Sequence, residues 1–266
     1  MEAAVDAESK TAAVSIAVDA AVSVDPHDPF VVLKNMCPVE RDGLTKLEGV
    51  LKEAPFNAKS LLTMPIGGCT RSPVRFERAA FDLYRFIEKR RVPWGERFGA
   101  TEFNMLAEQM RRSVEAMHAV DFIHCDVKPE NFLVYFCQHG RRAYEEPVDL
   151  EPAAYVRCMR IRLADLGGAT RSGRRILNVS HAFLPPGVVE QPVELIRARR
   201  RLDCWALGVS CVMLAAGSSP WRFATPRDAN FRAAGRMVDG CFRINPTGLD
   251  WLPEHAAGPV REMLCN

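Results

Sequence analysis

The stretch FIHCDVKPENFLV, residues 122–134, places a dense polar loop between two apolar ends. Asp126 and Asn131 lie five residues apart in this loop, and Lys128 lies between them. The flanking residues are aromatic or β-branched, which favours strands. The stretch therefore predicts a loop held between strands that carries a carboxylate, an ammonium group and a carboxamide side by side.

A second strand-like run, MRIRLAD at residues 159–165, ends on Asp165 and is followed by Gly167 and Gly168. Two carboxylates and a carboxamide at strand ends make an oxygen-rich site of the kind that Mg²⁺ prefers, with substrate phosphates completing its shell. Lys128 adds a positive charge that can meet a phosphate. Turn formation alone would account for Asp126 and Asn131 but not for Asp165. The residues predict a phosphoryl-transfer site.

Composition limits the alternatives. The chain has 266 residues, 48% of them hydrophobic, which suits one large domain or two lobes that share a cleft. A net charge of +2 argues against a nucleic-acid-binding protein, and the basic run at residues 197–201 is typical of a solvated or phosphate-facing surface. The nine cysteines form no CxxC pair, so we expect reduced thiols and no zinc site.

The sequence has no run of 18 apolar residues, and its first 30 residues lack a basic segment before their apolar ones. We therefore expect no membrane span and no signal peptide, which predicts an intracellular, cytoplasmic protein.

Hydrophobic patterning predicts few strands first and mostly helices afterwards. The expected strands are residues 30–36, 61–65, 74–76, 132–136 and 159–165. The expected helices are residues 40–54, 81–91, 101–119 and 202–216, followed by two or three more helical segments. The polar stretch 137–158 is long for a connection between paired strands.

The motifs HCDVKPENFLV and LADLGG resemble the catalytic loop and the metal-binding segment of eukaryotic protein kinases. SHAFLPPG at 180–187 and LDCWALGVSCVMLAAGSSPW at 202–221 resemble two later segments of that family, in the same order. The resemblance implies an α+β, two-lobed fold with a reduced N-terminal β lobe and a mainly helical C-terminal lobe. We expect a flexible Ala/Val-rich segment at 1–29, the N-lobe at 30–80 and the C-lobe at 81–266, with the family's last helices missing from this sequence.

The resemblance also implies roles for the loop residues. Asp126 would accept the proton of the substrate hydroxyl, and Lys128 would neutralise the transferred phosphate. Asn131 and Asp165 would hold Mg²⁺ between the phosphates of ATP. Asp203 would brace the catalytic loop from below.

In the small lobe, the resemblance implies a lysine for the α- and β-phosphates and a helical glutamate that holds it. Lys34 and Glu48 are the candidates. Phe76 would then stand at the back of the adenine site, with Glu77 and Ala79 in the hinge that faces the base.

The sequence departs from the family pattern at four places. No glycine precedes Gly43, so the glycine-rich phosphate loop expected near residues 12–24 is not recognisable. Leu166 replaces the usual phenylalanine after the metal-binding aspartate, which keeps an apolar residue there. Gly187 stands where the family has a glutamate, whose usual arginine partner would lie beyond the end of this sequence.

The fourth departure is Cys125, which stands where most of the family has an arginine that pairs with a phosphate on the activation segment. A thiol cannot make that charge-assisted bond. We therefore predict that phosphorylation of Thr170, Ser172 or Ser180 does not switch the protein on.

Two functions follow from the resemblance. One is an ATP- and Mg²⁺-dependent protein serine/threonine kinase, and the alternative is a pseudokinase, a kinase-shaped binding module that regulates a partner. A narrower likeness is to the divergent rhoptry kinases of parasitic protists. The sequence predicts neither the protein substrate nor the oligomeric state.

Overall fold

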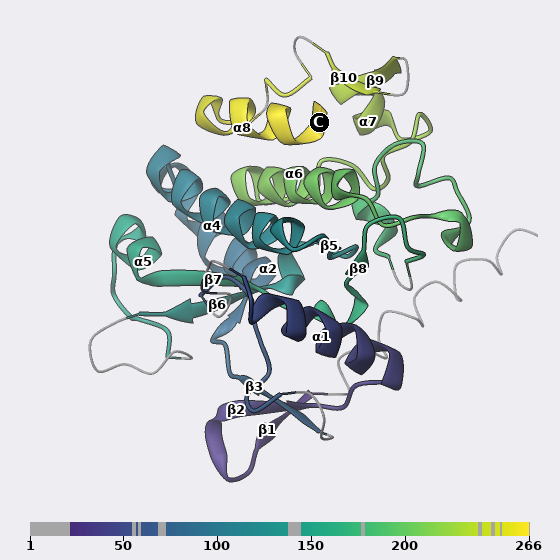
Figure 1. Cartoon of the computed structure of the whole chain (residues 1–266). Helices are drawn as coiled ribbons and strands as arrows, with labels where there is room; N and C mark the ends of the chain where they lie inside the picture. Colours follow the sequence, from purple (N-terminus) through teal and green to yellow (C-terminus); the bar gives the residue numbers. More distant parts are fainter. Residues whose placement is uncertain are drawn as a thin grey trace, which may run out of the picture.

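The structure is a computed structural model of the chain (Figure 1). The residues that it describes are 22–54, 57, 60–68, 73–137, 145–176, 179–238, 241–245, 248–250 and 252–265. A small sheet and one helix lie at one end of the molecule in Figure 1, and a group of several helices lies at the other end. The α+β fold with two unequal parts agrees with the sequence prediction.

The small sheet is antiparallel and contains β1 (Val22–Asp25), β2 (Asp28–Lys34) and β3 (Val74–Glu77) in that order. A bridge between Pro65 and Phe76 extends its far edge. β1 lies inside the stretch expected to be a flexible lead-in, so that expectation is wrong for residues 22–29. The valines of β1 pair with β2, and a tight turn joins the two strands. Residues 1–21, where most of the expected phosphate loop falls, lie outside the described residues.

Helix α1 (Pro38–Leu51) follows β2 directly and packs against the turn at Leu166–Gly168. Its first turn is closed by a capping box, in which Cys37 and Glu40 bond to each other's backbone amides. Helical spacing brings three apolar side chains to its inner face. These buried residues are Leu44, Leu47 and Leu51. The close approach of α1 to the turn requires glycine, because a Cβ on Gly167 would lie 2.8 Å from Cβ of Glu40.

The larger part begins after a short hinge. Its helices are α2 (Leu83–Phe86), α3 (Val92–Trp94), α4 (Ala100–Ala119), α5 (Pro152–Cys158), α6 (Arg200–Ala216), α7 (Ala229–Ala234) and α8 (Glu254–Cys265), with a π-helical turn at Ile87–Arg91. Its strands are β4 (Phe81–Asp82), β5 (Phe122–Ile123), β6 (Phe132–Phe136), β7 (Met159–Leu163), β8 (Thr170–Arg171), β9 (Gly235–Val238) and β10 (Cys241–Ile244). Short 3₁₀ turns lie at Gly95–Arg97, Pro129–Asn131, His181–Phe183 and Val193–Leu195.

The core of this part is built around α4 and α6, which are packed together and against α8 (Figure 1). The sheet β4–β6–β7 packs on α4, and α4 also contacts β5, so the strands on both sides of the polar loop between β5 and β6 are supported by α4. The expected helices 101–119 and 202–216 are therefore confirmed to within two residues. No helix within the described part of the chain is long and apolar enough to cross a membrane.

Two elements of the larger part differ from the prediction. Helix α5 lies within the stretch 137–158, which was expected to be a polar connection. A hairpin of β9 and β10 lies where only helices were expected. An aromatic cluster explains its position, because rings from α6, the following loop, α7 and β10 stack or meet edge to edge. The cluster consists of Trp205, Trp221, Phe231 and Phe242.

Candidate active site

The polar loop between β5 and β6 is anchored from below by Asp203 of α6. One carboxylate oxygen accepts hydrogen bonds from the backbone amide of His124, at 2.8 Å, and lies 2.9 Å from Nε2 of His118. The other accepts from the backbone amide of Cys125 at 2.9 Å. Asp203 is only 1% exposed, so its charge is balanced by these donors rather than by water. The bracing role predicted for Asp203 agrees with this geometry.

The loop gathers Asp126, Lys128 and Asn131 into one cluster. Nζ of Lys128 lies 2.9 Å from Oδ2 of Asp126, and Nδ2 of Asn131 donates to the same residue's backbone carbonyl at 2.7 Å. Oδ1 of Asp126 is buried and has no hydrogen-bond partner among the described residues. A buried carboxylate oxygen without a donor is costly, so it marks a place where a ligand's hydroxyl can bind.

Ser180 joins this cluster from a distant part of the chain. Its Oγ accepts a hydrogen bond from Nζ of Lys128 at 2.9 Å, so Lys128 is held between Asp126 and Ser180. Sequence reasoning treated Ser180 only as a phosphorylation candidate. The position of Ser180 at the start of the segment 180–187 was the available signal, but the contact with Lys128 depends on the fold.

Asp165 is tied to the loop through its neighbour Ala164. The amide of Ala164 donates to the carbonyl of Asn131 at 2.7 Å, and its own carbonyl lies 2.8 Å from Nε2 of His124. Asp165 itself adopts a left-handed backbone conformation with φ of 56°. Such a conformation is less favourable for a residue with a Cβ than for glycine, and aspartate adopts it more readily than most residues.

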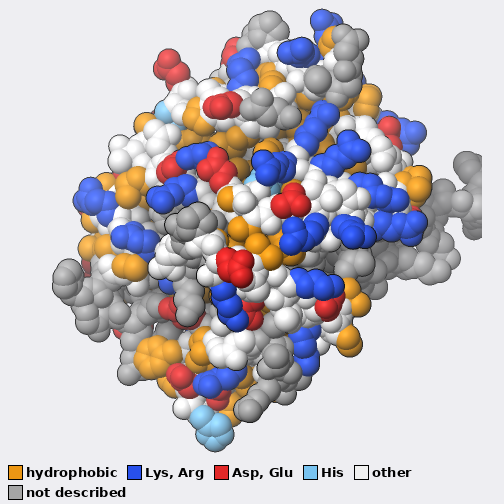
Figure 2. All heavy atoms as spheres, in the orientation of Figure 1, with side chains coloured by type: hydrophobic (Ala, Val, Ile, Leu, Met, Phe, Trp, Pro, Cys, Tyr) orange, Lys and Arg blue, Asp and Glu red, His pale blue; other side chains and the backbone are white. Residues whose placement is uncertain are grey.

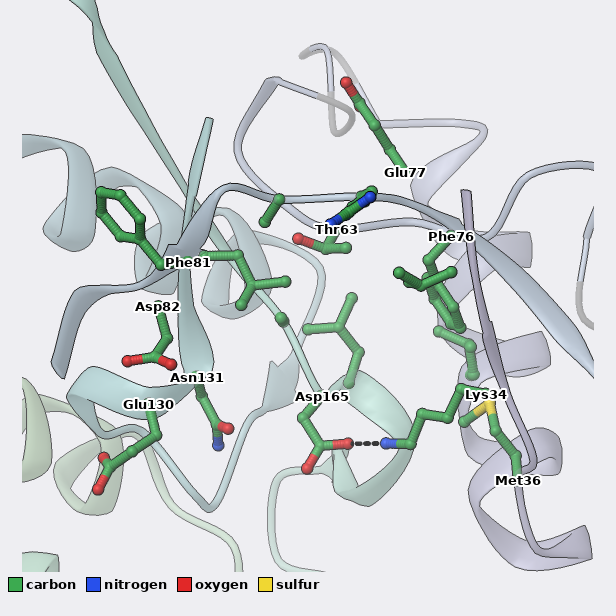
Figure 3. A pocket seen from close by; sticks show the side chains of 17 residues that line it. Lys34, Met36, Thr63, Phe76, Glu77, Phe81, Asp82, Glu130, Asn131 and Asp165 are labelled. Carbon is green, nitrogen blue, oxygen red and sulfur yellow. Dashed lines mark hydrogen bonds and ion pairs between the residues drawn. The ribbon is translucent and has the colours of Figure 1, made fainter. Parts of the chain in front are cut away.

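Lys34 reaches from β2 across the cavity to Asp165, with which it forms an ion pair (Figure 3). Burial alone would raise the pKa of the Asp165 carboxyl. The charge and hydrogen bond of Lys34, together with the charges of His124 and Lys128, outweigh that effect and lower the pKa. Asp165 is therefore ionised at neutral pH and available to a cation.

The predicted ion pair between Lys34 and Glu48 is not formed, although both residues are described. Glu48 forms an ion pair with Lys52, one turn further along α1, at 3.7 Å. The reason is the helix register, since Leu44 rather than an acid lines the cavity beside Lys34. The nucleotide-binding roles of Lys34 and Glu48 stay predictions.

The cavity at this site has a volume of about 410 Å³, a size typical of small-molecule pockets. Of the predicted residues, Lys34, Asn131, Asp165, Phe76, Glu77 and Ala79 line it. The side chain of Glu77 points away from the other labelled residues in Figure 3 and forms an ion pair with Arg162 outside. Its carbonyl accepts a weak bond from the hydroxyl of Tyr135 at 3.4 Å.

Among the residues that line the cavity, the polar or acidic side chains of Thr63, Asp82 and Glu130 were not predicted from sequence. Asp82 and Glu130 face the same end of the cavity (Figure 3). Burial raises the pKa of Glu130. Their place next to the hinge and the catalytic loop was visible in the sequence, but not their orientation into the cavity.

The oxygen atoms that Asn131 and Asp165 offer to a ligand fit Mg²⁺ bound together with the phosphates of ATP. Asn131 uses its amide nitrogen for Asp126, which leaves its oxygen for a cation, and Asp165 supplies a carboxylate. Within the described ranges, no group of three or more His, Cys, Asp or Glu side chains could hold a metal by itself. One carboxylate and one amide oxygen suit Mg²⁺ that is completed by phosphate oxygens.

Cys125 faces away from the cavity, into a second apolar cluster. Only 7% of it is exposed, and burial raises the pKa of its thiol far above the ordinary value. The cluster comprises Ile123, Cys125, Ile176, Leu184, Ile196, Ala198 and Leu202. The segment after Asp165 is held beside this cluster, because β8 pairs with β5 and the backbones of Arg175 and Arg197 form a β-bridge. Apolar packing therefore holds this segment where the family uses a charged pair.

A model of the protein kinase domain matches residues 78–255. The mouse serine/threonine-protein kinase SBK1 is 29% identical over 136 residues, which are 50% of this chain and 28% of that protein. The serine/threonine-protein kinase ArnS of Sulfolobus acidocaldarius is 26% identical over 115 residues, 41% of this chain and 17% of its own length. The Drosophila melanogaster serine/threonine-protein kinase meng-po is 25% identical over 128 residues, 45% of this chain and 23% of its own. The matches thus span less than a third of these relatives.

Proposed function

Because the chain belongs to the protein kinase family, we propose that it transfers the γ-phosphoryl group of ATP to serine or threonine hydroxyls of a protein substrate. The observation that carries this proposal is Oδ1 of Asp126, next to Lys128 and Asn131, which is buried and has no hydrogen-bond partner among the described residues. The names of the relatives SBK1, ArnS and meng-po support serine/threonine specificity.

In the proposed reaction, the substrate hydroxyl oxygen forms a bond to the γ-phosphorus while the bond between that phosphorus and the ADP oxygen breaks. Asp126 takes the hydroxyl proton through Oδ1, and Lys128 offsets the negative charge on the transferred group. Ser180 keeps Lys128 in place. Asn131 and Asp165 would hold Mg²⁺, which supplies charge stabilisation for the phosphates when bound.

Lys34, Glu48, Glu77 and Ala79 are proposed to serve nucleotide binding in different ways. Lys34 would contact the phosphates, and the backbone at Glu77 and Ala79 would face the adenine. Glu48 lies on α1 beside Gly68, away from Lys34, so its part would be limited to positioning the helix.

A pseudokinase is the second candidate, favoured by one observation. Lys34 lacks an acidic partner on α1, because Leu44 lines the cavity there, and its ion pair is with the metal-binding candidate Asp165. Bound Mg²⁺ must compete with Lys34 for that carboxylate. Weak nucleotide binding without transfer would fit this arrangement.

Thermal unfolding in the presence of ATP and Mg²⁺ tests whether the chain binds nucleotide, which the kinase proposal requires. A ligand at a hundredfold its Kd stabilises the folded state by about 2.7 kcal/mol, so we expect a clear upward shift in Tm for the wild type. Asp165→Asn should lose the Mg²⁺-dependent part of the shift. Asp42→Asn, an exposed and distant carboxylate change, is the matched control. A wild-type protein whose Tm does not respond would contradict the kinase proposal.

A further inference from the structure

A second, larger cavity lies on the outer side of α1 and has a volume of about 850 Å³. One wall is the outer face of α1, and the other is the segment from Gly167 to Arg175 together with Arg197. Five cationic side chains from three parts of the chain line it. They are Lys46, Arg171, Arg174, Arg175 and Arg197. Figure 2 shows Lys and Arg side chains gathered on this side of the molecule, where β8 and the loop after it lie in Figure 1.

Few carboxylates neutralise this cluster. Asp42 lines the cavity and pairs with Lys46, while Asp121 pairs with Arg171 at 3.7 Å across exposed surface. Among the ion pairs between described residues, none includes the side chains of Arg174 or Arg175. Among the described residues, the guanidinium of Arg197 donates only to the backbone carbonyls of Glu194 and Ile196. The cavity is therefore strongly positive in a chain whose net charge is only +2.

We propose that this basic cavity is a docking site for an acidic peptide segment of a partner protein. Its volume exceeds what a single phosphate fills and suits several side chains. The guanidinium group of each exposed arginine can donate two parallel hydrogen bonds to the two oxygens of one carboxylate. A nucleic acid fits less well, because the cations are confined to one cavity and the rest of the surface carries nearly balanced charge.

The position of the cavity gives docking a mechanical consequence. An occupant would touch α1 and the segment after Asp165 at once, two elements that already meet where Gly43 lies against the carbonyl of Gly167. It would therefore resist separation of α1 from the active-site turn. This function is independent of phosphoryl transfer, and a pseudokinase could use it equally well.

The test is fluorescence anisotropy with a labelled dodecapeptide of alternating glutamate and serine. Peptides with glutamine or lysine in place of glutamate, and a short oligothymidylate, are the competitors. The variants are the pair Arg174→Glu with Arg175→Glu, and a control pair, Arg227→Glu with Arg236→Glu, at exposed arginines outside the cavity. Both pairs change the net charge equally. Thermal unfolding of each variant verifies that it is folded.

We expect the glutamate peptide to bind the wild type, and to bind the cavity variant at least about tenfold more weakly, while the control pair retains most of the affinity. Added salt should weaken binding. Equal weakening by both pairs would show a general charge effect and overturn the proposal. Preferential binding of the oligothymidylate, or of the glutamine peptide, would overturn it as well.

Discussion

Lys34 of β2 forms its ion pair with Asp165, which lies two residues after the end of β7, and not with an acid on α1. The side chains are 15% and 33% exposed, so the pair is partly shielded from water. One contact therefore links the small sheet to the candidate metal site. It also makes Lys34 a competitor for any cation that binds Asp165.

Lys34→Met should lower the free energy of unfolding at neutral pH by about 1–2 kcal/mol, because it leaves the half-buried Asp165 carboxylate without its counter-charge. The pKa of Asp165 is lowered in the folded state, so the stabilisation is present above the unfolded pKa of about 3.9 and is lost as the pH falls through the folded pKa. Urea unfolding of both proteins between neutral and acidic pH measures this.

Lys46→Met is the control for that comparison, because its ion pair with Asp42 is exposed and should contribute less than about 0.5 kcal/mol. A difference between wild type and Lys34→Met that stays constant down to acidic pH would mean that Asp165 is not the partner that matters.

Leu44 and Leu47 offer a matched pair of substitutions on α1. Both are buried, but only Leu44 lines the cavity that contains Lys34. Leu44→Glu should therefore destabilise the protein by about 2 kcal/mol less than Leu47→Glu, whose carboxylate would be buried without a cation. Chemical denaturation gives both values. Equal losses would show that Lys34 cannot reach the helix.

The polar loop between β5 and β6 could be located from the sequence because its residues are close together in the chain. Asp126, Lys128 and Asn131 lie within six residues, and strands on either side fix the loop between them. Lys34 and Glu48 were paired wrongly because sequence spacing does not show which turn of the helix lies level with Lys34. Leu44 lines the cavity beside Lys34, and Glu48 lies one turn further along the same side of α1, beside Gly68.

Residues brought together by folding were harder to predict. Ser180 meets Lys128 across 52 positions of sequence, and no periodicity indicates that contact. The β9–β10 hairpin was missed because its aromatic and apolar residues also suit a helix, and the packing of Phe242 on Trp205 decides between them.

Cys125→Arg restores the residue type usual in the family, yet it should destabilise this protein by about 3 kcal/mol or more, since the guanidinium would enter an apolar cluster. Cys125→Ala is the control and should cost about 1 kcal/mol. Alanine is preferred to valine because the backbone φ of Cys125 is 69°, which disfavours β-branched residues. Equal stability of the two variants would contradict the apolar account of this segment.

Thr170→Glu and Ser172→Glu should leave phosphoryl transfer unchanged, because Cys125 has no charge to couple a phosphate to the catalytic loop. We expect a different result for Ser180, because its hydroxyl contacts Lys128. Ser180→Ala should slow transfer by about tenfold, the loss expected when a hydrogen bond to a charged group is removed. Steady-state rates for the three variants test this, and a large gain from either glutamate would refute it.

The central claim is that Asp126 makes this chain a phosphoryl-transfer enzyme. The most direct measurement is transfer of radiolabelled γ-phosphate from ATP to a generic serine- and threonine-containing protein, by wild type and by Asp126→Asn purified side by side. We predict transfer by the wild type in the presence of Mg²⁺, and a rate lower by about a hundredfold or more in Asp126→Asn, which lacks the proton acceptor. Equal rates from the two proteins, or no transfer by a folded wild type that binds ATP and Mg²⁺, would contradict the claim.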